Sequence, residues 1–371
     1  MLHSITIENY KILKNIKLNL SNLTLVSGLN SMGKSSLIQV MLLLRQSFEQ
    51  KVLTDRGLLL NGSYINVGKG KDALSIDAEN EMFSFVLEWE DKKNLDISFN
   101  YKSKSNLQPI NKLTPDKFDF SQALFSDNFQ YLAAERTGPK NSYPVSEYDV
   151  KTLNSLGNNG EYTAHYLFEN GAKQLLNKKL LHEKAKSATL LAQVDAWMSE
   201  ITPGIKITAN VIEDINQASL HYEFETGTGY TEKFRPENVG FGLTYVLPVV
   251  TSILASKKGD LIIIENPEAH LHPAGQSAVA KLMARAAQEG VQIIVETHSD
   301  HFLNGARIAV LTKLIEPENI SLFYFFKQLN NIEHTIDMIQ PFIDKNGRLD
   351  EWPEGFFDEW DKNLDKLLGH L

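Results

Sequence analysis

The sequence predicts an α/β fold, and three observations support this class. An apolar run, LTLV at 23–26, leads directly into the small and polar residues SGLNSMGKSS at 27–36. After this loop, apolar residues recur three and four apart up to Phe48, as on one face of a helix. Two aliphatic runs, 261–264 and 292–295, are each followed by a glutamate and are separated by a helical pattern. Strand, helix and strand in this order form the repeating unit of an α/β sheet.

Composition sets limits on the class of protein. A chain of 371 residues is long enough for two or three lobes, and its 42% hydrophobic and 22% charged residues are typical of a globular protein. The net charge of −9 argues against a surface that is basic all over and coats nucleic acid, but it permits a local basic groove. Because the chain has no cysteine, it has no disulfide, thiolate zinc site or cysteine nucleophile.

The N-terminus carries no targeting signal that we recognise. The first residues, MLHSITIENYKIL, lack the basic segment and apolar stretch of a signal peptide, and no run approaches 18 uninterrupted apolar residues. We therefore expect a cytoplasmic protein without a membrane partner.

The loop at 27–36 has the spacing of a phosphate-binding loop. Gly28, four further residues and then Gly33-Lys34-Ser35 fit the pattern GxxxxGK[ST]. In this pattern backbone N–H groups surround phosphate oxygens, the lysine reaches the outer phosphates and the hydroxyl ligates Mg²⁺. The preceding strand and the following helix give the context that the motif requires. A glycine-rich turn that happens to contain Lys-Ser is the alternative. The predicted nucleotide-binding residues are Gly28, Asn30, Ser31, Gly33, Lys34, Ser35 and Ser36.

Carboxylates follow the aliphatic runs of the second half. A buried parallel strand delivers the residues that follow it to the C-terminal edge of an open sheet, where ligands bind. Glu265 and Glu268 follow the first run, and Glu296 and His298 follow the second. We therefore expect acidic groups beside the bound phosphates. A helix-capping role for Glu265 is the alternative.

These motifs together resemble the head of an ATP-binding-cassette (ABC) type ATPase, in the branch that includes SMC, RecF and the OLD-family ATPases. More narrowly, the chain resembles bacterial AAA-type ATPases that end in a short domain of unknown function and often occur in anti-phage defence systems. The resemblance implies a P-loop NTPase fold with a mixed sheet, flanking helices, an antiparallel β subdomain and an inserted helical subdomain. It is carried by SGLNSMGKSS, YLAAERTGP, NVGFGLTYVLPVV, DLIIIENPEAHLHP, VETHSDHFLNGAR and DKNGRLDEWPEGFFDEW.

The same resemblance implies a division into four parts. Residues 1–100 would form the first part of the ATPase head with the phosphate loop, and 101–235 an inserted lid of helices and strands. Residues 236–315 would complete the head with the signature loop, the Walker B acid and the switch histidine, and 316–371 would form a small C-terminal domain.

ATP and Mg²⁺ are the cofactors that the resemblance implies, with a role for each matching residue. Lys34 would bind phosphate, Ser35 and Glu265 would hold the metal, and His298 would sense the γ-phosphate. The catalytic set would then consist of Lys34, Glu265, Asn266, Glu268 and His298.

The resemblance also implies a head-to-tail homodimer that encloses two nucleotides. Asn238, Val239, Gly240 and Gly242 resemble the signature loop, which contacts the γ-phosphate bound by the other subunit. A helix N-terminus with a glycine suits this contact, because the backbone can approach closely. His270 and His272 would lie in the D-loop at the dimer seam.

One position departs from the family pattern. Asn266 stands where a glutamate usually orients and deprotonates the attacking water. An amide cannot act as a base, and losing a general base costs about 10²–10⁴-fold in rate, or roughly 3–5 kcal/mol of barrier. Glu268 and Glu296 are the carboxylates available to replace it. We expect slow hydrolysis and a long-lived closed dimer, which turnover above about 10 s⁻¹ would contradict.

Three functions from different classes remain open. The first is an ATP-driven switch that controls a separate effector, such as a nuclease. The second is a RecF-like DNA-repair ATPase, for which Lys102, Lys104, Lys112 and Lys117 offer a modest basic stripe. The third is a scaffold locked by nucleotide, with little turnover.

Other side chains allow more than one interpretation. His270, His272, His298 and His301 could form a metal site instead of serving the interface and the γ-phosphate. Arg136 could reach nucleotide or form a surface salt bridge. The C-terminal aromatic residues could pack as an apolar cap or dock a partner; they are Trp352, Phe356, Phe357 and Trp360.

Overall fold

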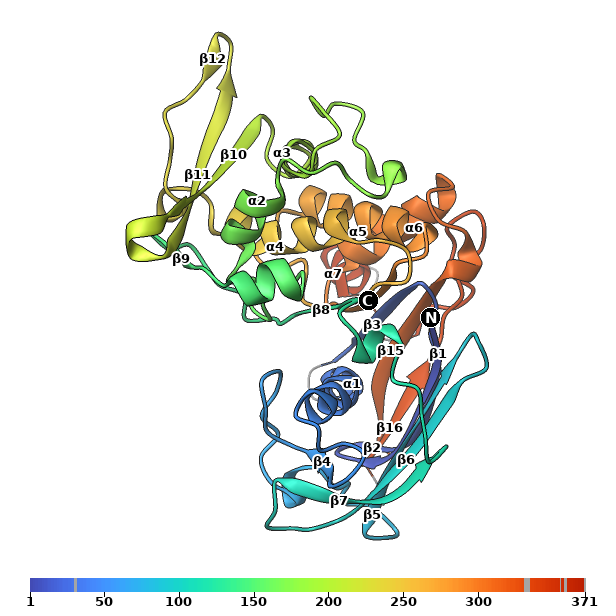
Figure 1. Cartoon of the computed structure of the whole chain (residues 1–371). Helices are drawn as coiled ribbons and strands as arrows, with labels where there is room; N and C mark the ends of the chain where they lie inside the picture. The colour runs from blue at the N-terminus through green and yellow to red at the C-terminus, as the bar shows by residue number, and fades with distance from the viewer. Residues whose placement is uncertain (30–31, 330–333, 354, 357–358, 370–371) are drawn as a thin grey trace. The chain divides into compact units, whose positions relative to one another are not determined.

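The computed structural model describes residues 1–29, 32–329, 334–353, 355–356 and 359–369 (Figure 1). These residues form two compact units. Unit 1 comprises Met1–Ser126, Ser321–Phe342 and Asp350–Leu371, and unit 2 comprises Asp127–Ile320 and Ile343–Leu349. The predicted loop residues Asn30 and Ser31 lie outside the described residues. The predicted functional division at residues 100, 235 and 315 is not tested by these units and stays a prediction.

An antiparallel sheet of six strands dominates unit 1, in the order β2-β1-β5-β6-β7-β4. Burial alternates residue by residue along all of β5, as expected for a strand with one face on a core. The strands are β1 (Leu2–Tyr10), β2 (Leu13–Asn19), β4 (Gly57–Leu59), β5 (Met82–Trp89), β6 (Asn94–Asn100) and β7 (Leu107–Thr114).

Strand β7 corrects one sequence-based expectation. The polar composition of residues 102–128 predicts a loop excursion, but β7 lies within it and pairs with both β6 and β4. Gln108 of β7 is buried, and its amide bonds the main chain of Lys102 and Ser105. Residues 107–114 therefore form a strand because of their main-chain pairing and the hydrogen bonds of Gln108, and a hydropathy pattern does not reveal either of these.

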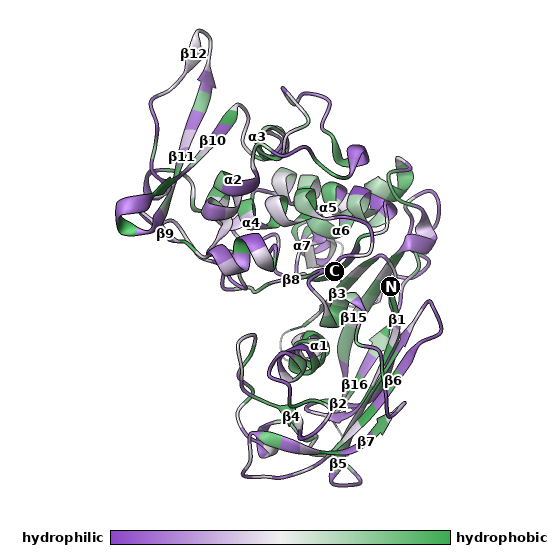
Figure 2. Cartoon of the chain, viewed as in Figure 1, coloured by the Kyte–Doolittle hydropathy of each residue, from purple (hydrophilic) through white to green (hydrophobic). Residues whose placement is uncertain are grey.

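The phosphate loop of unit 1 lies between β3 (Leu23–Gly28) and α1 (Lys34–Glu49). Strand β3 lies beside β15 (Ile320–Leu329), which pairs antiparallel with β16 (His334–Ile339). The predicted strand and helix on either side of the loop are both confirmed. Helix α1 buries its apolar face, and Figure 2 shows hydrophobic residues along it. Its fully buried residues include Leu37, Val40, Met41 and Leu44.

The C-terminal part of unit 1 ends in α7 (Glu359–Leu368). Phe356 is buried and packs against Tyr324 and Trp352, with ring centroids 5.0 and 5.6 Å away. Trp352 is about half exposed. Phe356 therefore acts as the apolar cap that the aromatic cluster predicts, while Phe357 lies outside the described residues.

Three parallel strands form the centre of unit 2. The order is β14 (Gln292–Glu296), β13 (Leu261–Glu265) and β8 (Phe129–Leu132). Helix α5 (Pro273–Gln288) packs against α4 (Phe241–Ala255) and α6 (Asp300–Leu311). The mixed strands and flanking helices of the two units confirm the predicted α/β fold class.

The rest of unit 2 includes two short helices and a four-stranded antiparallel sheet that projects past them (Figure 1). The helices are α2 (Thr163–Asn170) and α3 (Leu190–Ser199), and the strands are β9 (Tyr143–Pro144), β10 (Ile205–Ile212), β11 (Gln217–Thr226) and β12 (Gly229–Tyr230). None of the helices among the described residues combines the length and apolar character needed to cross a membrane.

A partly buried carboxyl joins α3 to β10. Asp195 Oδ1 accepts a hydrogen bond from the N–H of Ile207 at 2.8 Å. Burial raises the pKa of Asp195 to about 7, although the Ile207 N–H and the charges of Lys206 and Lys186 oppose this rise. Since the folded form holds this proton more tightly than the unfolded chain, its contribution to stability is present at low pH. It is lost as the pH rises from about 4 to about 7.

We predict that Asp195→Asn stabilises unit 2 at pH 8 relative to the native chain by roughly 1–3 kcal/mol, because it removes a buried charge and keeps the acceptor. At pH 4 the two should unfold alike. Urea denaturation at both pH values measures the difference. Asp214→Asn, which changes the same charge at an exposed position, is the control and should show no such pH dependence. An equal effect of Asp195→Asn at both pH values would contradict the prediction.

Candidate functional site

The loop between β3 and α1 passes very close to a neighbouring strand of unit 1. Gly28 has φ +143°, and an added Cβ there would overlap the carbonyl oxygen of Phe325 in β15. Gly33 has φ +89° and is the N-cap of α1. Both positions need glycine, for close approach in the first case and for the left-handed backbone in both.

Lys34 holds its charge inside this loop. The residue is 3% exposed, and its ammonium donates to the carbonyl oxygens of Gly28 and Leu29 at 2.9 and 2.6 Å. The N-cap of α1, Gly33, has no side chain that could cap the helix, and the first turn carries no acidic residue. The positive end of the helix dipole and a buried ammonium therefore occur together, which suits an anion. Ser35 is half-buried and Ser36 is buried.

The ends of β13 and β14 carry a separate group of candidate residues, in unit 2. Glu265 pairs with Glu296 in the parallel register. Tyr131 of β8 donates its hydroxyl to Glu265 Oε1 at 2.9 Å. Burial raises the pKa of Glu265, while the Tyr131 hydroxyl, the N–H of Ala134 and the charge of Arg136 oppose the rise. We call residues Glu265–Glu268 the acid turn.

Asn266 has a left-handed backbone, with φ +46°. Its N–H donates to the carbonyl of Glu296 at 2.8 Å. Asparagine tolerates this conformation better than glutamate does, so the backbone favours the residue that departs from the family pattern. Its Oδ1 is buried and finds no hydrogen-bond partner among the described residues. An acceptor left without a partner in this place fits a ligand or an ordered water.

Glu268 and His298 lie together. The N–H of His298 donates to Glu268 Oε1 at 2.7 Å. Burial raises the pKa of Glu268, and the N–H of His298 is the main group that opposes the rise. His298 itself is exposed. The structure thus brings Glu265, Asn266, Glu268 and His298 together at one edge of the parallel strands.

The predicted signature loop begins α4. Asn238 ends a short 3₁₀ turn and Gly240 is the N-cap of the helix. A Cβ added at Gly240 would meet no atom within 4 Å, whereas one at Gly242 would overlap the carbonyl oxygen of His270. Gly242 therefore has a packing role within its own chain, and Gly240 has none that the described residues reveal.

Two of the histidines considered for a metal site, His270 and His272, have other contacts. The ring of His270 packs edge-on against Phe241 and Tyr245 of α4, with centroids 4.9 Å away in each case. His272 Nδ1 accepts from the N–H of Ala274 and caps α5. In the part of the chain that the structure describes, no three His, Cys, Asp or Glu side chains are grouped to hold a metal ion.

Two residues of this edge gain a place that the sequence does not settle: Tyr131 has no predicted role, and Arg136 has two alternatives, contact with nucleotide or a surface salt bridge. Tyr131 and Arg136 belong to the segment YLAAERTGP, which the resemblance includes but whose side chains it does not interpret. Arg136 is buried, so the surface salt bridge considered for it is wrong. It donates to main-chain carbonyls, including that of Glu265 at 2.7 Å.

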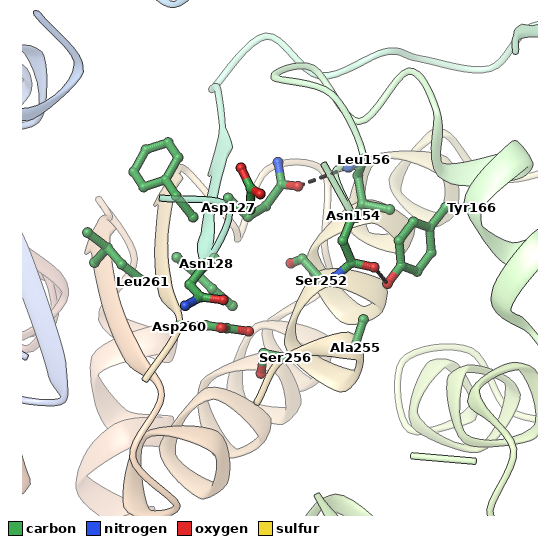
Figure 3. Close-up of a pocket in the computed structure, with 13 residues that line it drawn as sticks. Asp127, Asn128, Asn154, Leu156, Tyr166, Ser252, Ala255, Ser256, Asp260 and Leu261 are labelled. Atoms are coloured by element: carbon green, nitrogen blue, oxygen red, sulfur yellow. Dashed lines mark hydrogen bonds between the residues drawn. The ribbon is translucent and has the colours of Figure 1, made fainter. Parts of the chain in front are cut away.

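A small polar pocket lies at the opposite ends of the same strands (Figure 3). Asn128 precedes β8 and Asp260 precedes β13, so this edge is far from the acid turn. The pocket has a volume of about 30 Å³, enough for ordered water and too small for a nucleotide. The Tyr166 hydroxyl donates to Asn154 Oδ1 there at 2.8 Å.

Comparison with known families assigns the chain. Residues 23–304 match a family model described as "AAA domain, putative AbiEii toxin, Type IV TA system". The chain belongs to this family. Membership and the fold together make it a P-loop ATPase family member. A second model, described as "Protein of unknown function (DUF3696)", matches residues 315–367.

Three solved structures align with this family member over most of its length. An SMC head bound to the C-terminal winged-helix domain of ScpA is 12% identical, with a TM-score of 0.53 over 91% of this chain and 98% of that one. This likeness confirms the predicted ABC-type head fold. An SMC head from Thermotoga maritima is 11% identical, with a TM-score of 0.42 over 91% and 98% of the two chains. A Pyrococcus furiosus head with an extended coiled coil, bound to the C-terminal domain of ScpA, is 11% identical with a TM-score of 0.48 over 99% of each chain. No curated protein matches the sequence.

We predict that Gly242→Ala destabilises unit 2 by about 1–3 kcal/mol, because its Cβ would collide with the main chain of His270. Gly240→Ala should stay within about 0.5 kcal/mol of the native chain, since a weaker N-cap and a less flexible unfolded chain offset each other. Thermal unfolding of both variants measures this. Equal losses of stability would show that the two glycines do not differ in their surroundings.

Proposed function

We propose that this protein binds ATP with Mg²⁺ through Lys34 and the phosphate loop, and hydrolyses it slowly. The observation that carries the proposal is the buried ammonium of Lys34, held by loop carbonyls at the start of α1. The GxxxxGK[ST] spacing and the family membership support it.

The residues present fit a magnesium ion of the kind that accompanies nucleotides. Mg²⁺ keeps several waters and takes one or two carboxylates together with the phosphates, so it needs no closed cage of protein ligands. The Ser35 hydroxyl and the Glu265 carboxylate would hold it, and the buried Asn266 Oδ1 offers an acceptor for a water. The metal would supply charge stabilisation on the phosphates.

Glu268 is the group that we assign to proton removal. It would take over from the glutamate that usually stands at the position of Asn266. Burial raises the pKa of Glu268, which makes it a stronger base than a free carboxylate. Its bond to the main chain of His298 links it to the predicted γ-phosphate sensor. Because this bond also restrains the carboxylate, we expect turnover to be slow.

We predict that Glu268→Gln lowers ATP turnover by about 10²–10⁴-fold while MgATP binding remains, because an amide cannot accept the proton. Lys34→Ala should instead abolish binding. Steady-state turnover and fluorescent-nucleotide titration separate the two effects. Glu289→Gln, a partly exposed carboxylate at the end of α5, is the control and should leave both unchanged.

A rescue sharpens this test. Adding Asn266→Glu to Glu268→Gln should raise turnover at least tenfold above that of Glu268→Gln alone. Because residue 266 has a left-handed backbone, the added glutamate should cost about 1 kcal/mol of stability. If Glu268→Gln leaves turnover unchanged, another group removes the proton. If the native chain binds no MgATP, the proposed function fails as a whole.

We further propose that ATP joins two copies head to tail, with Gly240 of each copy approaching the nucleotide of the other. The open surroundings of Gly240 support this, because no described atom of its own chain lies within 4 Å of the position that a side chain would take, which leaves room for a second copy. Gly240→Ala should fold normally but remain monomeric with ATP. Sedimentation of the Glu268→Gln chain, with and without Gly240→Ala, measures this; an unchanged dimer would contradict the proposed contact.

The dimer would switch a separate effector, for which a nuclease in bacterial anti-phage defence is our proposal on family analogy alone. A DNA-binding ATPase is the second candidate, and a surface hollow in unit 1 supports it. Lys69, Lys102 and Lys104 line this hollow, whereas Lys112 is paired with Asp96 at 2.5 Å. Salt-dependent binding of duplex DNA by the purified chain would favour the second candidate.

A further inference from the structure

Arg136 is a buried cation of unit 2 that the nucleotide-binding motifs leave without a role. It follows β8, and it is 2% exposed. Burial lowers its pKa to about 10, and the charges of Glu268 and Glu265 are among the groups that oppose this. The guanidinium therefore remains charged at neutral pH, and a buried charge has to be matched by hydrogen bonds.

Main-chain carbonyls from three segments provide these bonds. Nη1 donates to Ala133 at the end of β8 and to Glu265, at 3.1 and 2.7 Å. Nη2 donates to Asn266 at 2.6 Å, and Nε donates to Tyr245 of α4 at 3.0 Å. One planar side chain thus joins the end of β8, the acid turn and the helix that the signature loop begins.

Helix α4 presents the Tyr245 carbonyl at a weakened turn. Pro248 lies inside the helix and has no N–H to donate to the carbonyl of Thr244. Its ring also crowds that carbonyl, and carbonyls in such a turn tilt away from the helix axis. Tyr245 lies in the turn that Pro248 interrupts, and its carbonyl oxygen accepts from Arg136 Nε.

Aromatic packing reinforces the same connection. The guanidinium carbon of Arg136 lies 5.7 Å from the centroid of the Tyr245 ring. That ring packs against His270, which follows the acid turn, and against Phe241 in the first turn of α4, at 4.9 and 4.8 Å. A shift of the first turn of α4 would therefore reach the acid turn through two sets of contacts.

We propose that Arg136 is a positioning residue that couples the N-terminus of α4 to the acid turn of the same chain. This inference rests on the proposed function. Contact of a second copy with Gly240 sets the position of α4, and Arg136 carries that position to the peptide groups of Glu265 and Asn266. The distance from Gly240 to Tyr245 along the helix is only about 7.5 Å, at 1.5 Å per residue.

The chemistry of the side chain makes the proposal testable. Lysine keeps the charge, but its three N–H groups radiate from one nitrogen and cannot reach carbonyls arranged around a planar fork. Arg136→Lys should therefore weaken the coupling while it preserves most of the buried charge. If Arg136 had only a structural role, Arg136→Lys would lower the stability of the protein and leave kcat unchanged.

The test is a double-mutant cycle of Arg136→Lys and Gly240→Ala in the full chain. We expect Arg136→Lys to lower kcat for ATP by about 10–100-fold, with the KM for MgATP changed less than threefold. In the double variant the loss should be at least fivefold smaller than the product of the two single losses, because both changes break one connection. Losses that multiply, or a kcat for Arg136→Lys within twofold of native, would overturn the coupling.

Two further variants keep the result interpretable. Arg45 of α1 is also buried and donates to the carbonyls of Leu124 and Ser126, so Arg45→Lys should lower the Tm without changing kcat by more than twofold.

Pro248→Ala acts on the Tyr245 contact from the helix side. It should lower kcat in the same way, and it decides the question if Arg136→Lys does not fold. An unchanged kcat for Pro248→Ala would then overturn the coupling. Absence of ATP turnover by the native chain would overturn the proposed function, and the coupling with it.

Discussion

Parallel pairing of β13 with β14 and β8 is the constraint on which the acid turn depends. Strands that run in the same direction end at the same edge, so residues far apart in sequence meet there. Tyr131 lies 134 positions before Glu265 and still bonds it, and His298 bonds Glu268 thirty positions earlier. A shift of one residue in this register would separate Glu265 from Glu296 and dissolve the set.

Buried cations in both units are held by main-chain carbonyls. Lys34 bonds two carbonyls of its own loop, and Arg136 bonds four from three segments. A carboxylate partner would offset the charge directly, whereas dipoles satisfy the hydrogen bonds and leave the net charge in place. In unit 1 the two carbonyls hold the ammonium within the loop that we propose binds phosphate. In unit 2 the bonds of Arg136 fix the backbone around the acidic groups.

Local backbone geometry explains the departure at residue 266. Asn266 and His270 both adopt left-handed conformations, which short polar residues tolerate and longer ones adopt at a cost. Such conformations persist where surrounding contacts hold them, and they gather at functional sites. The bond from Asn266 to Glu296 and the rings that pack on His270 are these contacts. Asn266 thus satisfies the turn, and the proton removal that we propose falls to a neighbouring carboxylate, Glu268.

The sequence alone determined the phosphate loop, its flanking strand and helix, and the acidic ends of the two aliphatic strands, because these depend on spacing over a few residues. Tertiary structure alone decided the strand β7, the burial of Arg136, the bond from Tyr131 to Glu265 and the contrast between Gly240 and Gly242. These features depend on contacts between segments as many as 134 residues apart. Hydropathy and motif spacing report on neighbours along the chain, and they contain no information on which distant carbonyl a buried side chain will meet.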